Sequence, residues 1–209
     1  MSLPLVPGPV ATGRIPLRPS PELVTERLVL RIPRRDEAEL IRDFHRVNAE
    51  FLQAWSPTRD PAIDSVDYWR DKIHTAHEEC RQDLAVRLTL FDRMDRMRVH
   101  GTASFTSIVR GVAQFCYLGY SLAETSQGKG YMTEALRGAI AYAFGPLDLH
   151  RIMANYMPRN DRSARVLSRL GFEREGLARG YLRINGVWED HVLTSLVNPS
   201  WNDSPPRRL

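Results

Sequence analysis

The segment from Phe115 to Leu136 joins an apolar strand pattern to a helical pattern through a glycine-rich turn. The strand pattern ends near Leu122, and the run Gln127-Gly128-Lys129-Gly130-Tyr131 stands where the helix opens. Glycines let the backbone turn tightly, so that successive N–H groups at a helix N-terminus converge on one point. The helix dipole adds to the attraction for an anion. The turn therefore predicts a strand–loop–helix unit that holds a phosphate group, with the side chain of Lys129 as added positive charge.

Two other phosphate-binding loops fit this turn poorly. A Walker loop needs glycine at position 123 and serine or threonine after the lysine, where the chain has Ala123 and Gly130. A dinucleotide-binding turn needs a third small residue where Thr133 stands, and it opens a parallel unit rather than following a hairpin. A helix N-terminus without any ligand stays open as the plain structural interpretation.

The rest of the chain alternates strand and helix patterns. Residues 1–22 contain six prolines and no periodicity, so we expect a flexible arm there, one domain over 23–198 and a tail over 199–209. The expected strands are 28–32, 86–90, 99–109, 112–122, 152–156, 181–184 and 187–196. The expected helices are 36–47, 65–81, 127–144 and 161–170, with a loop over 51–61. Hairpins joined to helices predict an α/β (α+β) domain with a mixed, mostly antiparallel sheet flanked by helices.

Composition excludes several classes of protein. The two cysteines, Cys80 and Cys116, have no metal-binding spacing, so we expect no disulfide framework, no metal and a reducing, cytoplasmic location. No segment is apolar and long enough to predict a membrane span. The net charge of +4 is spread along the chain, which fits a solvated basic surface or a polyanionic partner.

Two motifs resemble those of the GNAT superfamily of N-acetyltransferases. The run from Gln127 to Tyr131 is similar to their acetyl-CoA loop, Gln/Arg-x-x-Gly-x-Gly/Ala, in a shortened form. Asn160, Ser163 and Leu170-Gly171-Phe172 resemble the superfamily segment Asn-x-x-Ser/Ala that closes on Leu-Gly-Phe. The blocks GTASFTSIVRG, FCYLGYSL, HRIMANYMP and YLRINGVW resemble the ribosomal-protein alanine N-acetyltransferases of the RimJ/RimL group, and RimJ most closely. The resemblance covers roughly residues 24–198.

The resemblance implies a GNAT-like acyl-CoA N-acyltransferase fold and a set of acetyl-CoA contacts. The strand that ends at Leu122 would splay from the strand that starts near Arg151. Backbone groups of the first strand would bind the pantetheine arm, amides of the turn would bind the pyrophosphate, and an asparagine of the next helix would contact CoA. The implied acetyl-CoA-binding residues are Tyr120, Ser121, Leu122, Gln127, Gly128, Lys129, Gly130, Tyr131, Met132, Thr133 and Asn160.

The family transfers acetyl directly to an amine, so a group must protonate the leaving thiolate. Tyr117 and Leu167 occupy the positions where many relatives carry the glutamate and tyrosine used as base and acid. Ser163 takes the position of an acid proposed for RimL-like enzymes, and Tyr117 is its substitute. Alternatively, the Ser163 hydroxyl only satisfies backbone donors in the first turn of a helix.

The missing carboxylate favours an α-amine acceptor. An α-amine has a pKa of about 7.7–8.0 and a lysine about 10.4, so near pH 7.5 deprotonation costs roughly 0.5 and roughly 4 kcal/mol, respectively. Trp55 and Asp190 are candidate substrate-binding residues. The resemblance implies that Trp55 walls a peptide groove, or it simply caps the core, and Asp190 either orients the amine or is an ordinary surface carboxylate, which is the favoured interpretation. Packing or surface roles are the favoured interpretation of Cys116, His150 and His191.

We therefore expect an enzyme that acetylates the N-terminal alanine or serine of a protein, in particular a ribosomal protein, with possible contact to ribosomal RNA. Two alternatives stay open. One is an acetyltransferase for a small amine such as an antibiotic or polyamine, and the other is a catalytically weak module that binds ribosomes or nucleic acid.

Overall fold

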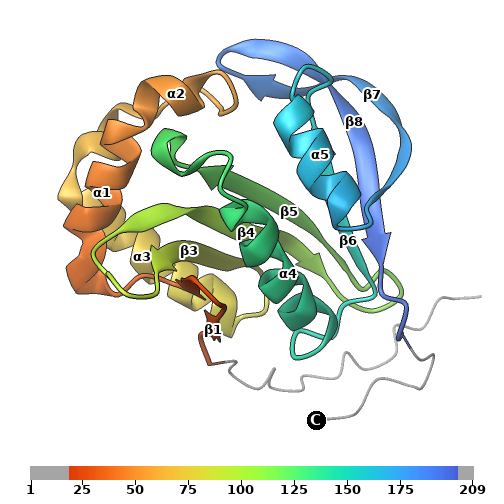
Figure 1. The fold of residues 1–209 in the computed structure, drawn as a ribbon, viewed down its shortest axis with the longest axis horizontal. Coiled ribbons are helices and arrows are strands. Elements are labelled where there is room, and N and C mark those ends of the chain that lie inside the picture. Colours follow the sequence, from red (N-terminus) through yellow and green to blue (C-terminus); the bar gives the residue numbers. More distant parts are fainter. Residues whose placement is uncertain (1–18, 202–209) are drawn as a thin grey trace, which may run out of the picture.

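The computed structural model of the chain describes residues 19–201, which form one eight-stranded sheet with helices on both faces (Figure 1). The strands are β1 (Glu22–Val24), β2 (Leu28–Arg31), β3 (Val86–Asp92), β4 (Val99–Val109), β5 (Phe115–Leu122), β6 (Arg151–Tyr156), β7 (Glu173–Ile184) and β8 (Val187–Val197). The helices are α1 (Ala38–Val47), α2 (Ala49–Gln53), α3 (Val66–Arg81), α4 (Tyr131–Phe144) and α5 (Asp161–Arg169), with 3₁₀ turns at Arg35–Glu37, Pro61–Asp64 and Glu124–Ser126.

The strands lie in the order β1-β2-β3-β4-β5-β6-β8-β7, and every described neighbouring pair is antiparallel except β5 and β6. This confirms the predicted mixed, mostly antiparallel sheet. Among residues 19–201, no helix is long and apolar enough to cross a lipid bilayer.

The two faces of the sheet differ in polarity. On one face, Leu88, Phe105 and Leu118 are buried in a core that also contains Leu136 of α4 and Leu167 of α5. On the opposite face, towards α1 and α3, hydroxyl side chains of β3 and β4 line a cavity of about 390 Å³. Burial of the apolar face under α4 stabilises the fold. The polar face instead lines a cavity.

The pairing between β5 and β6 is unusually short. It joins Phe115 to Arg151, Cys116 to Ile152 and Tyr117 to Met153, and goes no further. Beyond this point β5 continues its pairing with β4 to Leu122, while β6 continues its pairing with β8. The two parallel strands therefore diverge towards their C-terminal ends, which confirms the predicted splay.

Several strands and helices begin or end at residues other than the predicted ones. Strand β1 was not predicted, and α2 occupies the start of the expected loop over 51–61. Strand β5 begins at Phe115 rather than at position 112, because Val112 is fully exposed in the turn after Gly111, whose φ is +72°. Strand β7 begins at Glu173, well before the expected 181, because it pairs with the full length of β8.

Two helix predictions also needed correction. Val47 was assigned to the buried face of α1, but its side chain is 78% exposed at the end of the helix. Helix α4 begins at Tyr131 rather than Gln127, because Gly128 and Gly130 have φ values of +74° and +79°, outside the helical region. The predicted arm over 1–22 lies mostly outside the described residues, and β1 includes its last residue, Glu22.

Gly101 is a position where the sheet tolerates no side chain. A Cβ there would overlap the carbonyl oxygen of Ser121 on the neighbouring strand. We expect Gly101→Ala to lower the free energy of unfolding by about 1–3 kcal/mol, because β4 must move away from β5. Gly176→Ala is the matched control, since a Cβ there meets nothing within 4 Å. Urea denaturation measures both, and equal stabilities would contradict the packing described.

Candidate active site

The glycine-rich turn opens helix α4 with its amides free of a side-chain cap. The N-cap residue, Gly130, has no side chain with which to cap the helix. The first N–H groups of any helix lack intrahelical partners. A Cβ at Gly128 would meet nothing within 4 Å, so the space beside the turn is open. Gly128 and Gly130 have positive φ values, a conformation that turns the backbone tightly ahead of the helix. The turn therefore fits a phosphate group.

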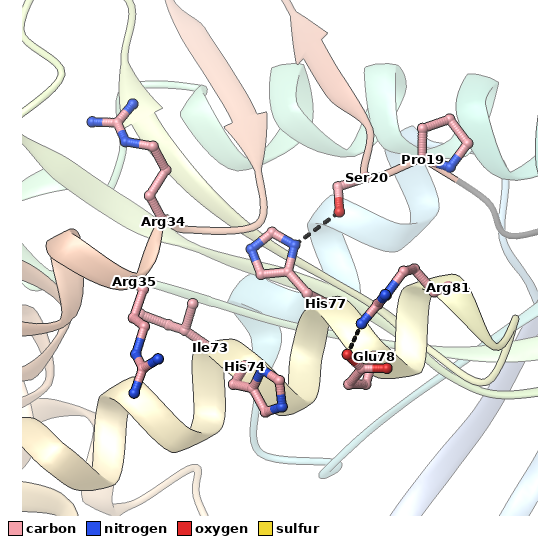
Figure 2. A pocket seen from close by; sticks show the side chains of 9 residues that line it. All are labelled: Pro19, Ser20, Arg34, Arg35, Ile73, His74, His77, Glu78 and Arg81. Atoms are coloured by element: carbon pink, nitrogen blue, oxygen red, sulfur yellow. Dashed lines mark hydrogen bonds and ion pairs between the residues drawn. The ribbon is translucent and has the colours of Figure 1, made fainter.

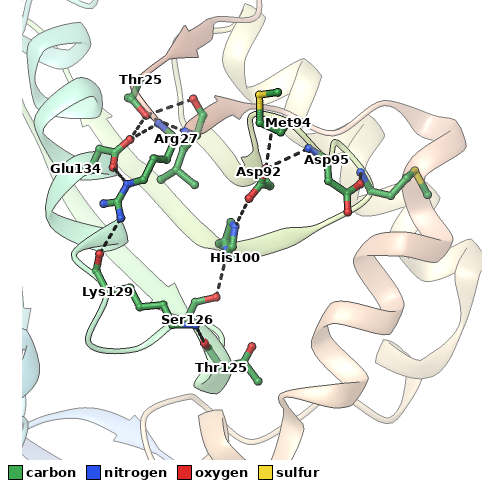
Figure 3. Close-up of polar contacts among 12 residues, drawn as sticks. Thr25, Arg27, Asp92, Met94, Asp95, His100, Thr125, Ser126, Lys129 and Glu134 are labelled. Atoms are coloured by element: carbon green, nitrogen blue, oxygen red, sulfur yellow. Dashed lines mark hydrogen bonds and ion pairs between the residues drawn. The ribbon is translucent and has the colours of Figure 1, made fainter.

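An ion pair holds the turn from the side away from that open space (Figure 3). The Arg27 guanidinium donates to the Lys129 carbonyl at 2.9 Å and to the Glu134 carboxylate at 2.6 Å. Thr25 donates a further hydrogen bond to Glu134 at 2.7 Å. Burial alone would raise the pKa of Glu134, but the bonds from Thr25 and Arg27 outweigh it and hold the pKa below its usual value. The charged pair fixes the first turn of α4 against the β1–β2 loop.

The ammonium group of Lys129 serves the loop itself. It donates to the Thr125 carbonyl at 2.8 Å, at the 3₁₀ turn that precedes the glycines. The sequence interpretation placed this charge beside a phosphate, whereas the structure places it on a backbone oxygen. The side chain of Gln127 is used in the same way, since its amide donates to the Leu122 carbonyl at 3.0 Å. Both side chains brace the turn, and the amides are left to face a ligand.

A chain of polar side chains supports the start of the turn (Figure 3). Asp92 accepts from His100 Nε2 at 3.1 Å, and His100 Nδ1 bonds the Ser126 hydroxyl at 2.8 Å. The hydrogen bond from His100 holds the pKa of Asp92 below its usual value. The His100 ring also stacks on Tyr131 at 4.3 Å between centroids. Sequence reasoning missed this chain, because its members are far apart in sequence and each stands alone in its own segment.

Ser163 and Tyr120 meet on the α4–α5 side of the sheet. The Tyr120 phenol and the Ser163 hydroxyl are 2.7 Å apart. Burial raises the pKa of Tyr120 to about 12, so the phenol stays protonated. The Asn160 side-chain oxygen accepts from the Ser163 amide at 3.0 Å and caps α5. The capping role considered for the Ser163 hydroxyl thus belongs to Asn160, and the hydroxyl faces Tyr120.

Tyr117 lies on the other side of β5. It alternates with Leu118 and Tyr120, which pack against the core under α4, so it faces the polar side with Gly119 and Ser121. The Ser121 hydroxyl is 2.9 Å from that of Thr102, which lines the polar cavity.

The Tyr117 phenol bonds that of Tyr181 on β7, a residue that sequence reasoning did not single out. Burial, and then the contact with Tyr117, raise the pKa of Tyr181. The Asn155 amide lies 3.4 Å from the Tyr181 oxygen. The only sequence signal for Tyr181 was its place in the block YLRINGVW. The two candidate catalytic residues, Ser163 and Tyr117, therefore flank β5 from opposite faces.

The candidate substrate-binding residues differ in their placement. The Asp190 carboxylate accepts from the Gly180 amide at 2.8 Å and stabilises the irregular segment of β7, so it is engaged with the backbone. Trp55 follows α2, is 37% exposed, and lies 5.7 Å from the Arg159 guanidinium. The structure brings Trp55 towards the C-terminal end of β6. Asp190 is not available there as a free carboxylate, because it is bonded to the backbone.

The remaining candidates have packing roles. Burial raises the pKa of Cys116 to about 12, so its thiol stays neutral and is a poor nucleophile. The His150 ring packs edge-on against Trp201, and the buried His191 donates from Nδ1 to the Glu189 carbonyl.

Comparison with known proteins identifies the family. The model of the GNAT acetyltransferase domain matches residues 27–173. The [ribosomal protein uS5]-alanine N-acetyltransferase of Escherichia coli is 44% identical over 183 residues, which cover 88% of this chain and 94% of that protein. A probable N-acetyltransferase of Bacillus subtilis is 41% identical over 152 residues, which cover 73% and 83%. The crystal structure of the ribosomal-protein-S5-alanine acetyltransferase of Vibrio fischeri superposes with a TM-score of 0.82 at 36% identity, covering 87% of this chain and 98% of that one.

A family model over most of the chain, a relative at 44% identity over nearly its whole length and a matching solved fold agree with one another. The glycine-rich turn that opens α4 and the diverging strands β5 and β6 are the parts of the fold that suit an acyl-CoA donor. This chain belongs to the GNAT family of acetyltransferases, and its acetyl donor is acetyl-CoA.

Proposed function

We propose that this enzyme acetylates the α-amine of a protein N-terminus, with alanine or serine as first residue and a ribosomal protein as acceptor. The opening between β5 and β6 carries the proposal: the glycine-rich turn follows the end of β5, and Tyr117, in contact with Tyr181, stands at the last residue pair of the β5–β6 ladder. The 44% identity to an enzyme named for the alanine of uS5 supports the choice of acceptor. Such an enzyme acts in the cytoplasm, where ribosomal proteins are made. We propose residues 23–198 as its catalytic domain.

The donor side of the site follows from the turn. Amides from Gly128 to Thr133 would hold the pyrophosphate, and the strand edge from Tyr120 to Leu122 would pair with the pantetheine arm, since β6 leaves this edge unpaired. Asn160 holds the start of α5 in place beside the arm, through its bond to the Ser163 amide. Acetyl-CoA supplies the thioester carbon that the amine attacks.

The proton steps use side chains on both faces of β5. The amine forms a bond to the acetyl carbon and gives up a proton to water, the bond to sulfur breaks, and the thiolate takes a proton from the Ser163 hydroxyl, which water then reprotonates. The Tyr120 phenol, which burial keeps protonated, donates to the Ser163 oxygen and steadies it. An α-amine with a pKa near 7.7–8.0 is roughly a quarter to two-fifths deprotonated near pH 7.5, far more than a lysine, so water suffices as base. Tyr117 and Tyr181 would position the amine on the polar face.

A basic surface beside α3 supports a contact with ribosomal RNA (Figure 2). A cavity of about 480 Å³ lies between α3 and the segment around Arg34. Its lining carries three arginines and two histidines against one glutamate: Arg34, Arg35, Arg81, His74, His77 and Glu78. Ion pairs engage Arg34 with Glu37 and Arg81 with Glu78. Arg35 makes no ion pair within the described residues, so we propose that it meets RNA phosphates.

Arg35→Glu should weaken binding to a short ribosomal RNA hairpin and reduce the salt dependence of the affinity by about one charge unit. The matched control is Arg98→Glu, an equal charge reversal in the exposed turn between β3 and β4. Fluorescence anisotropy at two salt concentrations measures both. The same affinity for the parent protein and both variants would remove the RNA contact from the proposal.

Donor binding should depend on Gly128. A glutamate side chain there would occupy the space that a pyrophosphate needs and would repel it, so Gly128→Glu should raise the Kd for acetyl-CoA well over tenfold. Gly111→Glu is the matched control, because its φ of +72° imposes the same backbone strain and a Cβ there also meets nothing within 4 Å. Isothermal titration gives both constants, and an unchanged Kd in Gly128→Glu would contradict the location of the donor site.

The role of Ser163 can be separated from helix stability. If its hydroxyl protonates the thiolate, Ser163→Ala should lower the single-turnover rate by about 10²–10⁴-fold and leave acetyl-CoA affinity nearly unchanged. Ser168→Ala, an exposed serine of the same helix, is the control and should keep the parent rate. A rate for Ser163→Ala within threefold of the parent would assign thiolate protonation to water or to a tyrosine.

A further inference from the structure

A short segment spans the opening between β5 and β6 on the side of α1 and α3. We call residues 48–56, which comprise α2 and the turn after it, the strap. At one end, Asn48 Oδ1 accepts from the Glu124 amide at 3.1 Å, just before the phosphate-binding turn. At the other end, the Ser56 carbonyl accepts from the Asn185 amide at 2.9 Å, in the turn between β7 and β8. Figure 1 shows α2 passing from α1 to this hairpin.

An arginine joins the strap to the β6 side of the opening. Arg159 follows the last residue of β6 by three positions, and its guanidinium pairs with Glu189 of β8 at 2.6 Å. The same guanidinium lies 3.5 Å from the Ala54 carbonyl and 5.7 Å from the centre of the Trp55 ring. Arg159 therefore contacts the strap, the hairpin and the end of β6 together.

The strap lies on the same side of the sheet as Tyr117. Tyr117 faces the polar side of the sheet, and the strap crosses that side between the two flanks of the opening. Trp55 and the Arg159–Glu189 pair therefore lie on the side from which a chain end would reach the phenols. A slender, extended N-terminus meets this requirement better than a side chain on a folded surface.

The pair also sets the charge along this path. Arg159 is 49% exposed and Glu189 is 24% exposed, so water screens them only in part. When the two side chains are paired, their electric fields nearly cancel at a distance of several ångströms from the pair. If one partner is neutralised, the other keeps a full charge beside the incoming chain.

We propose that Arg159 and Glu189 are specificity-determining residues, which form a charge-balanced gate for the first residues of the acceptor. This proposal rests on the function proposed above, because it presumes a peptide acceptor. The balanced pair admits N-termini whose second and third residues carry little net charge. An unpaired Glu189 would favour basic N-termini, and an unpaired Arg159 would favour acidic ones.

The test uses three acceptor peptides that begin with alanine and differ at positions two and three, which are neutral, both aspartate or both lysine. For Arg159→Gln, kcat/KM for the lysine peptide relative to the aspartate peptide should rise about three- to tenfold, the expected size for a charge several ångströms away near a surface. For Glu189→Gln, the ratio should fall by a similar factor. The swapped variant Arg159→Glu/Glu189→Arg keeps a pair and should return the ratio to the parent value.

The control is a second arginine–glutamate pair with nearly the same exposure. Arg87 of β3 and Glu79 of α3 pair at 2.6 Å with 46% and 25% exposure, on the same face of the sheet but three strands away from β6, so Arg87→Gln and Glu79→Gln should leave the ratio unchanged. If the parent enzyme acetylates no peptide, the proposed function fails. If the parent acetylates the peptides but the ratio is the same in the gate variants, or shifts equally in the control pair, the gate proposal is overturned. An unchanged Kd for acetyl-CoA shows that each variant is folded and keeps its donor site.

Discussion

The loss of pairing between β5 and β6 after Tyr117 is the constraint on which the rest of the site depends. Backbone N–H and C=O groups that a sheet would normally satisfy are left facing the space between the two strands. Unpaired backbone groups are costly when buried, so a fold keeps them only where something else meets them. The pantetheine arm of acetyl-CoA contains amides of the right kind to do so. In the proposed donor site, the pantetheine arm would complete a sheet that the protein leaves incomplete.

The turn beside this opening is rigid for reasons that lie outside the turn itself. Arg27 and Glu134 tie it to the β1–β2 loop, and Asp92 and His100 fix Ser126 just ahead of the glycines. A turn with two glycines would otherwise lose much conformational entropy on binding a ligand. Supporting bonds made before the ligand arrives reduce that loss. In the proposed donor site, residues outside the turn would therefore hold its amides in place for the ligand.

Much of the fold was predictable because it repeats local patterns. Alternating apolar residues located β2, β3 and β4, and Ser65 at the N-cap located α3 to within a residue. The glycine-rich turn located the start of α4 to within four residues. Strand β1 and the first half of β7 escaped, since short or solvent-facing strands at a sheet edge carry little hydrophobic alternation.

The site was predictable only in part, because some of its contacts join segments that are distant in sequence. A motif such as the turn lies within one segment, so its residues can be found by reading along the chain. The bonds between Tyr117 and Tyr181, and between Tyr120 and Ser163, join segments far apart in sequence. Lys129, Gln127 and Asp190 had the chemistry expected of ligand-binding residues, but the fold uses all three to satisfy its own backbone.

The short β5–β6 ladder has a mechanical consequence as well. Among the described strands, it is the one place where the sheet joins β1–β5 to the group β6, β7 and β8. The ladder closes a loop that runs through the whole of α4. Three residue pairs resist bending far less than the longer ladders on each side. The backbone therefore joins the two groups only at the base of the opening, and the single core shared by α4, α5 and both groups supplies the rest of the connection.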